Sequence, residues 1–438
     1  MAQIKDIFSR LYKLVFDIFF YSAALSVILG LLPDHLFTGF SQFKPVAYQN
    51  DHLFRGLEGQ PWNDDLVSKA KLLGVDELYG PESLHVIGDY VYTGLADGRL
   101  VRVHKDSEKI EEIVNFGAAV DGCAPGVISK LVKCGRVLGL RHHTDGFLYL
   151  VESGSGVYRV NLTTKSKEHL KWKGQTEGSA IYNDLVFDPT DDGLLYVSVS
   201  TAKWNLDQIA WSIVEHDTTG YVLAVDLKAG KASKVTDGQA LLNGLEISAD
   251  KKHLLFSVTN DYAIKKIPLK DVREAIKSGT VVPESKVTLF GKLLPGEPDN
   301  IRLDESTGDI LVGMFTTRPD SKLFRDYLTN WPFTRKALAR TAYTLSVALK
   351  YIHENLYPNH GLETLSWDLY SGHIVYKLLP KRDGAVIKLD GVTGEVKRIL
   401  GSSKFNSISE AIVDPATGDL YYGSFRNTFI GRIKKGDH

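Results

Sequence analysis

Side chains that carry an oxygen atom recur along this chain at one position of a repeated pattern. The pattern is a polar residue, a strand of about seven residues, a glycine turn and a second strand, and its copies begin near residues 82, 139, 183, 243, 300 and 410. In five of the six copies the opening residue is an acid or an amide: Glu82, Asn183, Asn243, Asn300 and Glu410. Carboxylate and amide oxygens are the ligands that a hard cation such as Ca²⁺ prefers.

The repeat itself predicts the fold. Two alternating runs joined by a glycine turn are typical of an antiparallel hairpin, and regular repetition of such hairpins is typical of propeller blades. We therefore expect an all-β fold, a six-bladed β-propeller over residues 81–438. A β-sandwich is the alternative, but one pattern with glycine at a constant offset disfavours it. Because blades are related by rotation about one axis, residues at one phase of the repeat should meet at the channel mouth.

The oxygen residues at that phase predict a metal site. Asp299 precedes Asn300 and adds a second carboxylate, so Glu82 and Asp299 would neutralise a divalent cation, and the amides of Asn183 and Asn243 would add neutral oxygens. No set of histidines and cysteines has the spacing of a zinc site. The sequence thus predicts Ca²⁺ held by a group of residues that we call the oxygen ring: Glu82, Asn183, Asn243, Asp299 and Asn300.

A cation in the oxygen ring could polarise the carbonyl, phosphoryl or lactone oxygen of a substrate, and hydrolysis would then need a base. The candidate catalytic residues are His142, near the start of blade two, and Glu410, which could instead be an extra ligand or a structural acid. The chain lacks a Gly-x-Ser-x-Gly elbow, a His-Glu-x-x-His motif, a phosphate-binding glycine loop and a dinucleotide fingerprint. Serine hydrolase, zinc protease, kinase and dehydrogenase chemistry are therefore disfavoured.

The N-terminal segment predicts a membrane anchor. Residues 14–32 contain a single charge, Asp17, and this length suffices for a bilayer. Basic residues precede the apolar run and the next one is Lys44, which predicts a cytoplasmic segment 1–13, a transmembrane signal anchor 14–33 and a lumenal or extracellular body. A cleaved signal peptide is the alternative, but the run is long and no suitable cleavage site follows. We expect a single-pass type II protein of the endoplasmic reticulum or plasma membrane.

Four further features fit a body outside the cytosol or complete the organisation of the chain. Cys123 and Cys134 are expected to form a disulfide, with two unrelated buried thiols as the alternative. The only glycosylation sequon begins at Asn161. Residues 34–80 are expected to be a linker and lead-in that wraps the body or supplies the closing strand. Residues 319–370 are expected to be a helical insertion in blade five that caps the barrel, covers the site as a lid or docks on the membrane.

The net charge excludes one class of partner. Lys and Arg number 52 against 53 Asp and Glu, so the chain has no basic field for nucleic acid.

Three motifs resemble the strictosidine synthase-like family, in particular its animal branch. They are Cys134–Arg141, Pro298–Arg302 and the segment from Ile408 through Arg426. The resemblance implies a six-bladed propeller related to paraoxonases and gluconolactonases, with a channel Ca²⁺ on the oxygen ring and arylesterase-type activity. Two departures limit it. Leu138 falls where paraoxonases have a histidine proposed as the base, and the register of Glu410 against the metal-free catalytic glutamate of the plant synthase is uncertain by a residue.

Three hypotheses follow. The first is a membrane-anchored, Ca²⁺-dependent hydrolase of small hydrophobic esters or lactones, with the metal as Lewis acid. The second is a non-catalytic binding propeller in which Ca²⁺ is structural. The third is lyase-type condensation of the strictosidine synthase kind at Glu410 without metal.

Overall fold

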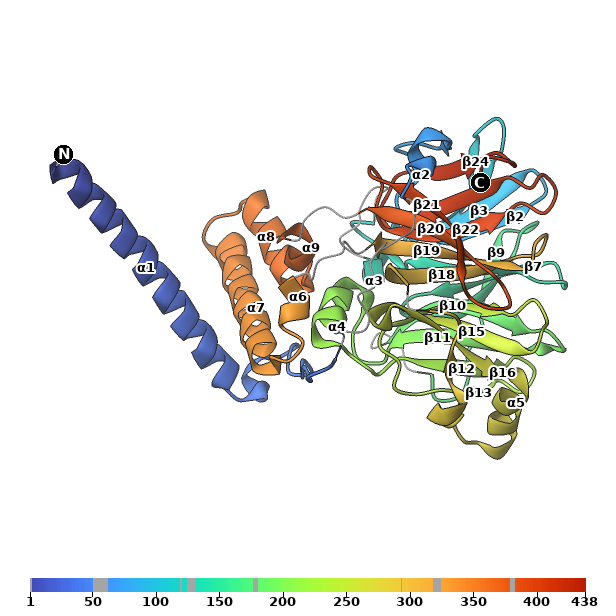
Figure 1. Cartoon of the computed structure of the whole chain (residues 1–438), viewed down its shortest axis with the longest axis horizontal. Coiled ribbons are helices and arrows are strands. Elements are labelled where there is room, and N and C mark those ends of the chain that lie inside the picture. Colours follow the sequence, from blue (N-terminus) through green and yellow to red (C-terminus); the bar gives the residue numbers. More distant parts are fainter. Residues whose placement is uncertain are drawn as a thin grey trace. The chain divides into compact units, whose positions relative to one another are not determined.

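Six antiparallel sheets of four strands each form the main body of the protein (Figure 1). The computed structural model describes residues 2–49, 62–118, 120–123, 131–175, 180–292, 294–317, 324–378 and 383–438. The chain divides into two compact units. The propeller unit comprises residues 50–207, 217–322 and 381–438, and the helical unit comprises residues 1–49, 208–216 and 323–380.

The first three blades follow one another along the chain. Their strands are β2 (Leu84–Ile87), β3 (Tyr90–Gly94), β4 (Arg99–His104) and β5 (Ile110–Asn115), then β6 (Val137–His142), β7 (Phe147–Glu152), β8 (Gly156–Asn161) and β9 (Ser166–His169), then β10 (Ile181–Asp188), β11 (Asp191–Thr201), β12 (Tyr221–Asp226) and β13 (Lys231–Lys234).

The last three blades complete the circle. Their strands are β14 (Leu242–Ile247), β15 (His253–Val258), β16 (Ala263–Pro268) and β17 (Thr288–Leu289), then β18 (Gly296–Asp304), β19 (Asp309–Thr317), β20 (Gly384–Leu389) and β21 (Val396–Ser402), then β22 (Ile408–Val413), β23 (Leu420–Ser424), β24 (Ile430–Ile433) and β1 (Lys71–Leu73).

The first strands of the blades surround the axis. They contact one another in the order β2, β6, β10, β14, β18 and β22, and β22 returns to β2. The six-bladed propeller expected from the repeat is thereby confirmed. The sixth blade is completed from the other end of the chain, because β1 (Lys71–Leu73) pairs antiparallel with β24 (Ile430–Ile433). Of the two roles considered for the lead-in, the structure shows that it supplies the closing strand.

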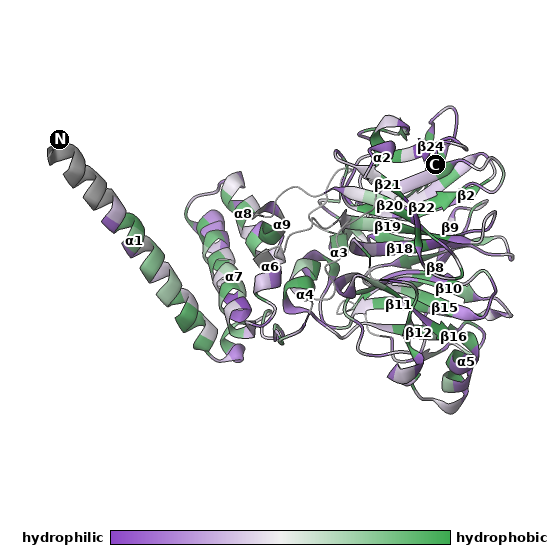
Figure 2. Ribbon diagram, viewed as in Figure 1, coloured by the Kyte–Doolittle hydropathy of each residue, from purple (hydrophilic) through white to green (hydrophobic). Residues whose placement is uncertain are grey.

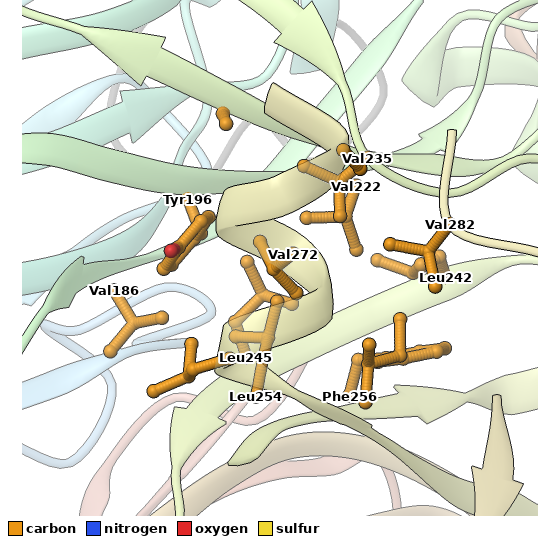
Figure 3. Packing of buried hydrophobic residues seen from close by; sticks show 14 of the residues in the cluster. Val186, Tyr196, Val222, Val235, Leu242, Leu245, Leu254, Phe256, Val272 and Val282 are labelled. Atoms are coloured by element: carbon orange, nitrogen blue, oxygen red, sulfur yellow. The ribbon is translucent and has the colours of Figure 1, made fainter. Parts of the chain in front are cut away.

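Apolar side chains fill the space between neighbouring blades. Figure 3 shows one such cluster, in which residues of blades three and four pack with the short amphipathic helix α5 (Leu269–Ser278). Val186 and Tyr196 come from blade three, Leu245 and Phe256 from blade four, and Val272 from α5. Burial of each such side chain contributes about 1.5–3 kcal/mol. This packing holds the inner strands at the close spacing that the axial site needs.

Short helical segments connect the strands of the propeller unit. They are α2 (Asp65–Ser68), α3 (Leu131–Cys134), η3 (Thr259–Asp261) and η4 (Glu284–Lys286), with η2 (Leu206–Gln208) at the unit boundary. Cys134 at the end of α3 is bonded to Cys123, with the two Cα atoms 5.5 Å apart. The expected disulfide is confirmed.

The helical unit contains the N-terminal segment and the blade-five insertion. Its helices are α1 (Ala2–Leu31), η1 (Asp34–Leu36), α4 (Ile209–Glu215), α6 (Phe324–Tyr327), α7 (Pro332–Asn355), α8 (His360–Ser371) and α9 (Ile374–Leu378). The helices of the insertion therefore continue beyond residue 370, where we expected them to end, and residues 319–323 lie outside the described part of the chain. Residues Tyr12–Leu31 of α1 are long and apolar enough to cross a membrane, and Figure 2 shows their hydrophobic colouring.

The end of α1 packs against α7 within the helical unit. The Arg340 guanidinium is buried and donates hydrogen bonds to the carbonyls of Leu29 (3.0 Å), Gly30 (3.2 Å) and Leu32, and it also pairs with Asp34. The last carbonyls of a helix have no partner inside the helix, and a cation at that end is favourable. Arg340 therefore caps α1 from a segment far away in the sequence.

Candidate metal site at the propeller axis

A bulge occurs at the same phase in five of the six inner strands. Each strand pair shifts register there, between Val137 and Leu140, Tyr182 and Leu185, Leu242 and Leu245, Pro298 and Ile301, and Ile408 and Glu410. Bulges interrupt alternation and redirect side chains, and they are frequent at functional sites. Four residues of the oxygen ring lie in these bulges: Asn183, Asn243, Asp299 and Asn300. The fifth, Glu82, lies two residues before β2.

Glycines beside the ring residues permit the inner strands to approach closely. A Cβ atom on Gly244 would lie 2.5 Å from the backbone nitrogen of Ile301 and 2.6 Å from Cα of Asn300. A Cβ on Gly139 would likewise lie 2.6 Å from Asp184 Oδ1. The glycines therefore bring the ring-bearing strands of neighbouring blades together near the axis.

The amide oxygens of the ring have no hydrogen-bond partner in the part of the chain that the structure describes. The Oδ1 atoms of Asn183, Asn243 and Asn300 are buried, and none of them accepts a hydrogen bond from a described residue. The side-chain amide of Asn243 opposes the rise in the pKa of Asp299, as a donor facing that carboxylate would. Leaving a buried acceptor unpaired costs about 1–3 kcal/mol. Three such oxygens at one phase of the repeat fit a bound cation.

Both carboxyl groups of the oxygen ring have raised pKa values. Burial raises the pKa of Glu82 to about 7, although the neighbouring Arg136 opposes the shift. Burial and the charge of Glu82 raise the pKa of Asp299 well above its usual value. Mutual repulsion of two buried carboxylates is relieved by a shared cation. The donor set of two acids and three amides therefore fits Ca²⁺.

A zinc-type cluster is not part of this site. Over the described ranges, no group of three or more His, Cys, Asp or Glu side chains is arranged to hold a metal. The ring has only two acids, and its remaining oxygens come from amides, as expected for a site of hard oxygen ligands.

Arg136 is the charged residue beside the ring that sequence reasoning missed. Its side chain is fully buried, with Nη2 3.5 Å from Glu82 Oε2 and its guanidinium 4.9 Å from the ring centre of Phe425. These partners are 54 and 289 residues away in the chain. The one available signal was a charged residue directly before an apolar inner strand.

Glu410 belongs to a buried ion network next to the ring. Its carboxylate accepts hydrogen bonds from Ser83 Oγ (2.8 Å) and the Leu84 amide (2.8 Å), and it pairs with Arg302. Arg302 Nη1 also donates to Asp184 Oδ2 at 2.7 Å. Burial raises the pKa of Glu410 even though Arg302 opposes it. With these partners, the contacts favour a structural acid among the three roles considered for Glu410.

The same network includes Asp184, which directly follows the ring residue Asn183. Burial favours its neutral form, but Arg302 and Arg141 outweigh that effect and lower the pKa of Asp184. Its Oδ2 also accepts a hydrogen bond from the Leu245 amide at 2.8 Å. Asp184 thus joins blades three, four and five at the axis.

The structure separates His142 from the oxygen ring. His142 is the exposed last residue of β6, whereas the buried Leu138 occupies the ring phase of that strand. Four residues of extended strand span roughly 13 Å. The ring centre of His142 lies 6.1 Å from that of His85, whose pKa is lowered to about 3 by burial and by Arg141. Neither histidine is placed as a base for a ligand at the ring.

Asn161 lies at the end of β8, away from the inner strands. Its Oδ1 accepts hydrogen bonds from the backbone amides of Thr163 and Thr164, both at 2.9 Å. The glycan at this position stays a prediction.

The fold and the ring define a class of protein, the six-bladed propellers with a polar, oxygen-lined axis. Two solved structures share the fold. They are a gluconolactonase from Xanthomonas campestris (TM-score 0.50, 12% identity, covering 85% of this chain and 93% of that one) and a luciferin-regenerating enzyme (TM-score 0.50, 12% identity, covering 84% and 96%).

Family models place the chain more closely. The model described as SMP-30/Gluconolactonase/LRE-like region matches residues 91–322, and the one described as Strictosidine synthase-like, N-terminal matches residues 62–103. The chain belongs to the SMP-30/gluconolactonase/LRE-like family, and the strictosidine synthase-like family that its motifs suggested is also shown.

Relatives from animals and plants match to a similar degree. The adipocyte plasma membrane-associated proteins of Salmo salar and Homo sapiens are each 28% identical, over 83% of this chain and 78% and 77% of theirs. The strictosidine synthase-like 13 protein of Arabidopsis thaliana is 29% identical over 84% of this chain and 89% of its own.

Proposed function

We propose that this protein is a membrane-anchored, Ca²⁺-dependent hydrolase of esters or lactones that acts at the oxygen ring. The observation that carries the proposal is the set of buried, unpaired amide oxygens of Asn183, Asn243 and Asn300 beside two carboxylates. Glu82, Asp299 and the three asparagines would hold the ion. A Ca²⁺ ion there supplies Lewis acidity toward a carbonyl oxygen.

Residues in and beside the oxygen ring support the binding of a cation there. The side-chain amide of Asn243 favours the ionised Asp299 carboxylate, and the bulged inner strands place these residues at one phase of the repeat. Arg302 neutralises Asp184 and Glu410 nearby, so these acids do not compete for the ion. The likeness to the gluconolactonase family supports a lactone or ester as substrate.

The anchor is α1, with the propeller on the lumenal or extracellular side of the endoplasmic reticulum or plasma membrane. Large apolar side chains of α1 are exposed, including Phe19 (73%) and Leu31 (70%), as expected for contact with lipid. Lys5, Arg10 and Lys13 precede the apolar run, which supports a cytoplasmic N-terminus. The Cys123–Cys134 disulfide supports an oxidising compartment for the body.

A second candidate function is a non-catalytic binding propeller with a structural Ca²⁺. Leu138 occupies the ring phase of blade two and cannot accept a proton. Glu410 is engaged by Arg302, and His142 lies at the other end of its strand. These placements favour a site that binds a ligand without a protein base.

Asn243→Ala distinguishes the two functions. The full-length protein in detergent is melted with Ca²⁺ and with a chelator, and hydrolysis of a panel of aryl esters and lactones is measured. At about 100 times its dissociation constant, Ca²⁺ should stabilise the wild type by roughly 2.7 kcal/mol, and the variant should lose this gain because one ligand is missing. The exposed Asn355 on α7 provides the matched control, Asn355→Ala, which should change neither property.

The outcomes separate the proposals. Turnover that is lost in Asn243→Ala while the chain remains folded supports the hydrolase. A Ca²⁺-dependent melt without turnover of any substrate in the wild type supports the binding propeller. The absence of any Ca²⁺ effect on the wild type would refute both.

A further inference from the structure

Arg136 combines complete burial with unused hydrogen-bonding capacity. Its Nε and Nη1 atoms are buried and have no acceptor among the described residues. Its Nη2 atom makes only long contacts, 3.5 Å to Glu82 Oε2 and 3.4 Å to the Phe425 carbonyl. A buried guanidinium normally uses its donors in close hydrogen bonds. Hydrogen bonding therefore does not explain why a buried arginine stands at position 136.

The backbone around Arg136 fixes where its side chain can lie. Cys134 forms a disulfide bond with Cys123. Gly135, which links Cys134 to Arg136, has a φ of 76°, a backbone conformation that favours glycine. The Arg136 amide donates to the Leu131 carbonyl at 3.1 Å, and its carbonyl accepts from the Ser153 amide at 2.9 Å. The side chain is thus held beside the ring by a cross-linked segment.

Neighbouring groups also confine the guanidinium itself. One face lies over the Phe425 ring, and a Cβ atom on Gly80 would approach Nη1 to 2.9 Å. Burial lowers the pKa of Arg136, while Glu82, Asp97 and Asp299 oppose that shift. Asp97 already forms an ion pair with Arg99 at 2.8 Å. The carboxylates whose charge Arg136 balances are therefore those of Glu82 and Asp299.

We propose that Arg136 is a built-in counter-cation of the oxygen ring, which limits the affinity of the ring for divalent metal. The inference rests on the proposed cation site but not on hydrolysis. When ionised, Glu82 and Asp299 together carry two negative charges, and Arg136 supplies one positive charge to the same buried space. A divalent ion entering the ring meets this fixed positive charge in a medium of low dielectric, where repulsion is strong. The ring therefore binds Ca²⁺ more weakly than its oxygen ligands alone would allow.

The test is Ca²⁺ titration of the full-length protein in detergent by calorimetry, with Arg136→Met and Arg136→Lys. Arg136→Met keeps the apolar stem and removes the charge, so we expect its Ca²⁺ dissociation constant to fall at least tenfold. Arg136→Lys keeps the charge and should bind within about threefold of the wild type. The half-exposed Arg159, paired with Glu168 on the outer strands, gives the control Arg159→Met, which should not change binding.

A second readout separates charge from packing. La³⁺ carries one more positive charge than Ca²⁺, so Arg136 should penalise it more, and the preference for La³⁺ over Ca²⁺ should rise in Arg136→Met. A purely structural arginine would change both affinities by the same factor. Should Arg136→Met fail to fold, Arg136→Gln takes its place with the same expectation.

Each result bears on the proposal. Tighter Ca²⁺ binding by Arg136→Met, or binding by that variant alone, supports it. Unchanged or weaker binding in a folded charge-free variant overturns it while leaving the cation site intact. Loss of Ca²⁺ binding from every protein tested overturns both the site and the role of Arg136, whereas Ca²⁺ binding without ester or lactone turnover overturns only the hydrolase.

Discussion

Arg302 shows at the scale of a residue how charge holds the axis together. It neutralises Asp184 and Glu410, both fully buried, and these two acids also bind the amides of Leu245 and Leu84. Arg302→Met should leave two buried carboxylates without a cation and lower the free energy of unfolding by roughly 3–5 kcal/mol. Urea denaturation of the full-length protein measures the loss.

The control for this prediction is an ion pair at the surface. Arg159 and Glu168 are 35% and 58% exposed, and a pair of this kind contributes about 0–1 kcal/mol. Arg159→Met should therefore change stability little. Equal decreases in the free energy of unfolding of the two variants would show that the buried ion network does not stabilise the contacts between blades.

The α1–α7 contact makes a prediction at the scale of an element. Ser26 Oγ of α1 lies 2.9 Å from Thr341 Oγ1 of α7, one turn from the Arg340 cap. Cysteines at both positions should cross-link under mild oxidation of the full-length protein, since the native cysteines are already bonded to each other. Adding Arg340→Gln should reduce the yield several-fold, because three carbonyls at the end of α1 lose their donor.

The exposed Val347 on α7 supplies the comparison. A pair of cysteines at positions 26 and 347 should cross-link poorly, because residue 347 lies on another face of the helix. Equal yields at 341 and 347 would contradict the packing described for α1 and α7.

Elements also explain what the sequence could and could not predict. The glycine turns and alternating runs are local signals, so the blades and the shared phase of Asn183 and Asn243 could be predicted. That residues 34–80 could supply the closing strand was one of two predictions made for that segment. The bulges could not, because a bulge is defined against a paired strand. Arg136 was missed for a related reason. Its partners Glu82 and Phe425 lie in blades one and six, which meet only when the propeller closes.

The whole molecule should respond to pH through the ring. The folded-state pKa of Glu82, about 7, exceeds its usual 4.5, and that of Asp299 is also raised. A raised carboxyl pKa stabilises the folded protein below the unfolded-state value, and this stabilisation is lost as pH rises through the folded-state value. In a chelator, the melting temperature should therefore fall between about pH 4.5 and 7, with Glu82 alone contributing roughly 3 kcal/mol.

Ca²⁺ should remove this fall, because the ion stabilises the ionised carboxylates that are costly without it. Melting curves of the full-length protein from pH 5 to 8, with Ca²⁺ and with chelator, should diverge as pH rises. Asp299→Asn should flatten the chelator curve, since one of the two mutually repelling acids is gone. Carboxylates held by arginines, such as Asp184, have lowered pKa values and lose their stabilising effect only in acid, so they do not alter this window. Parallel curves with and without Ca²⁺ would show that the two ring acids do not share a cation.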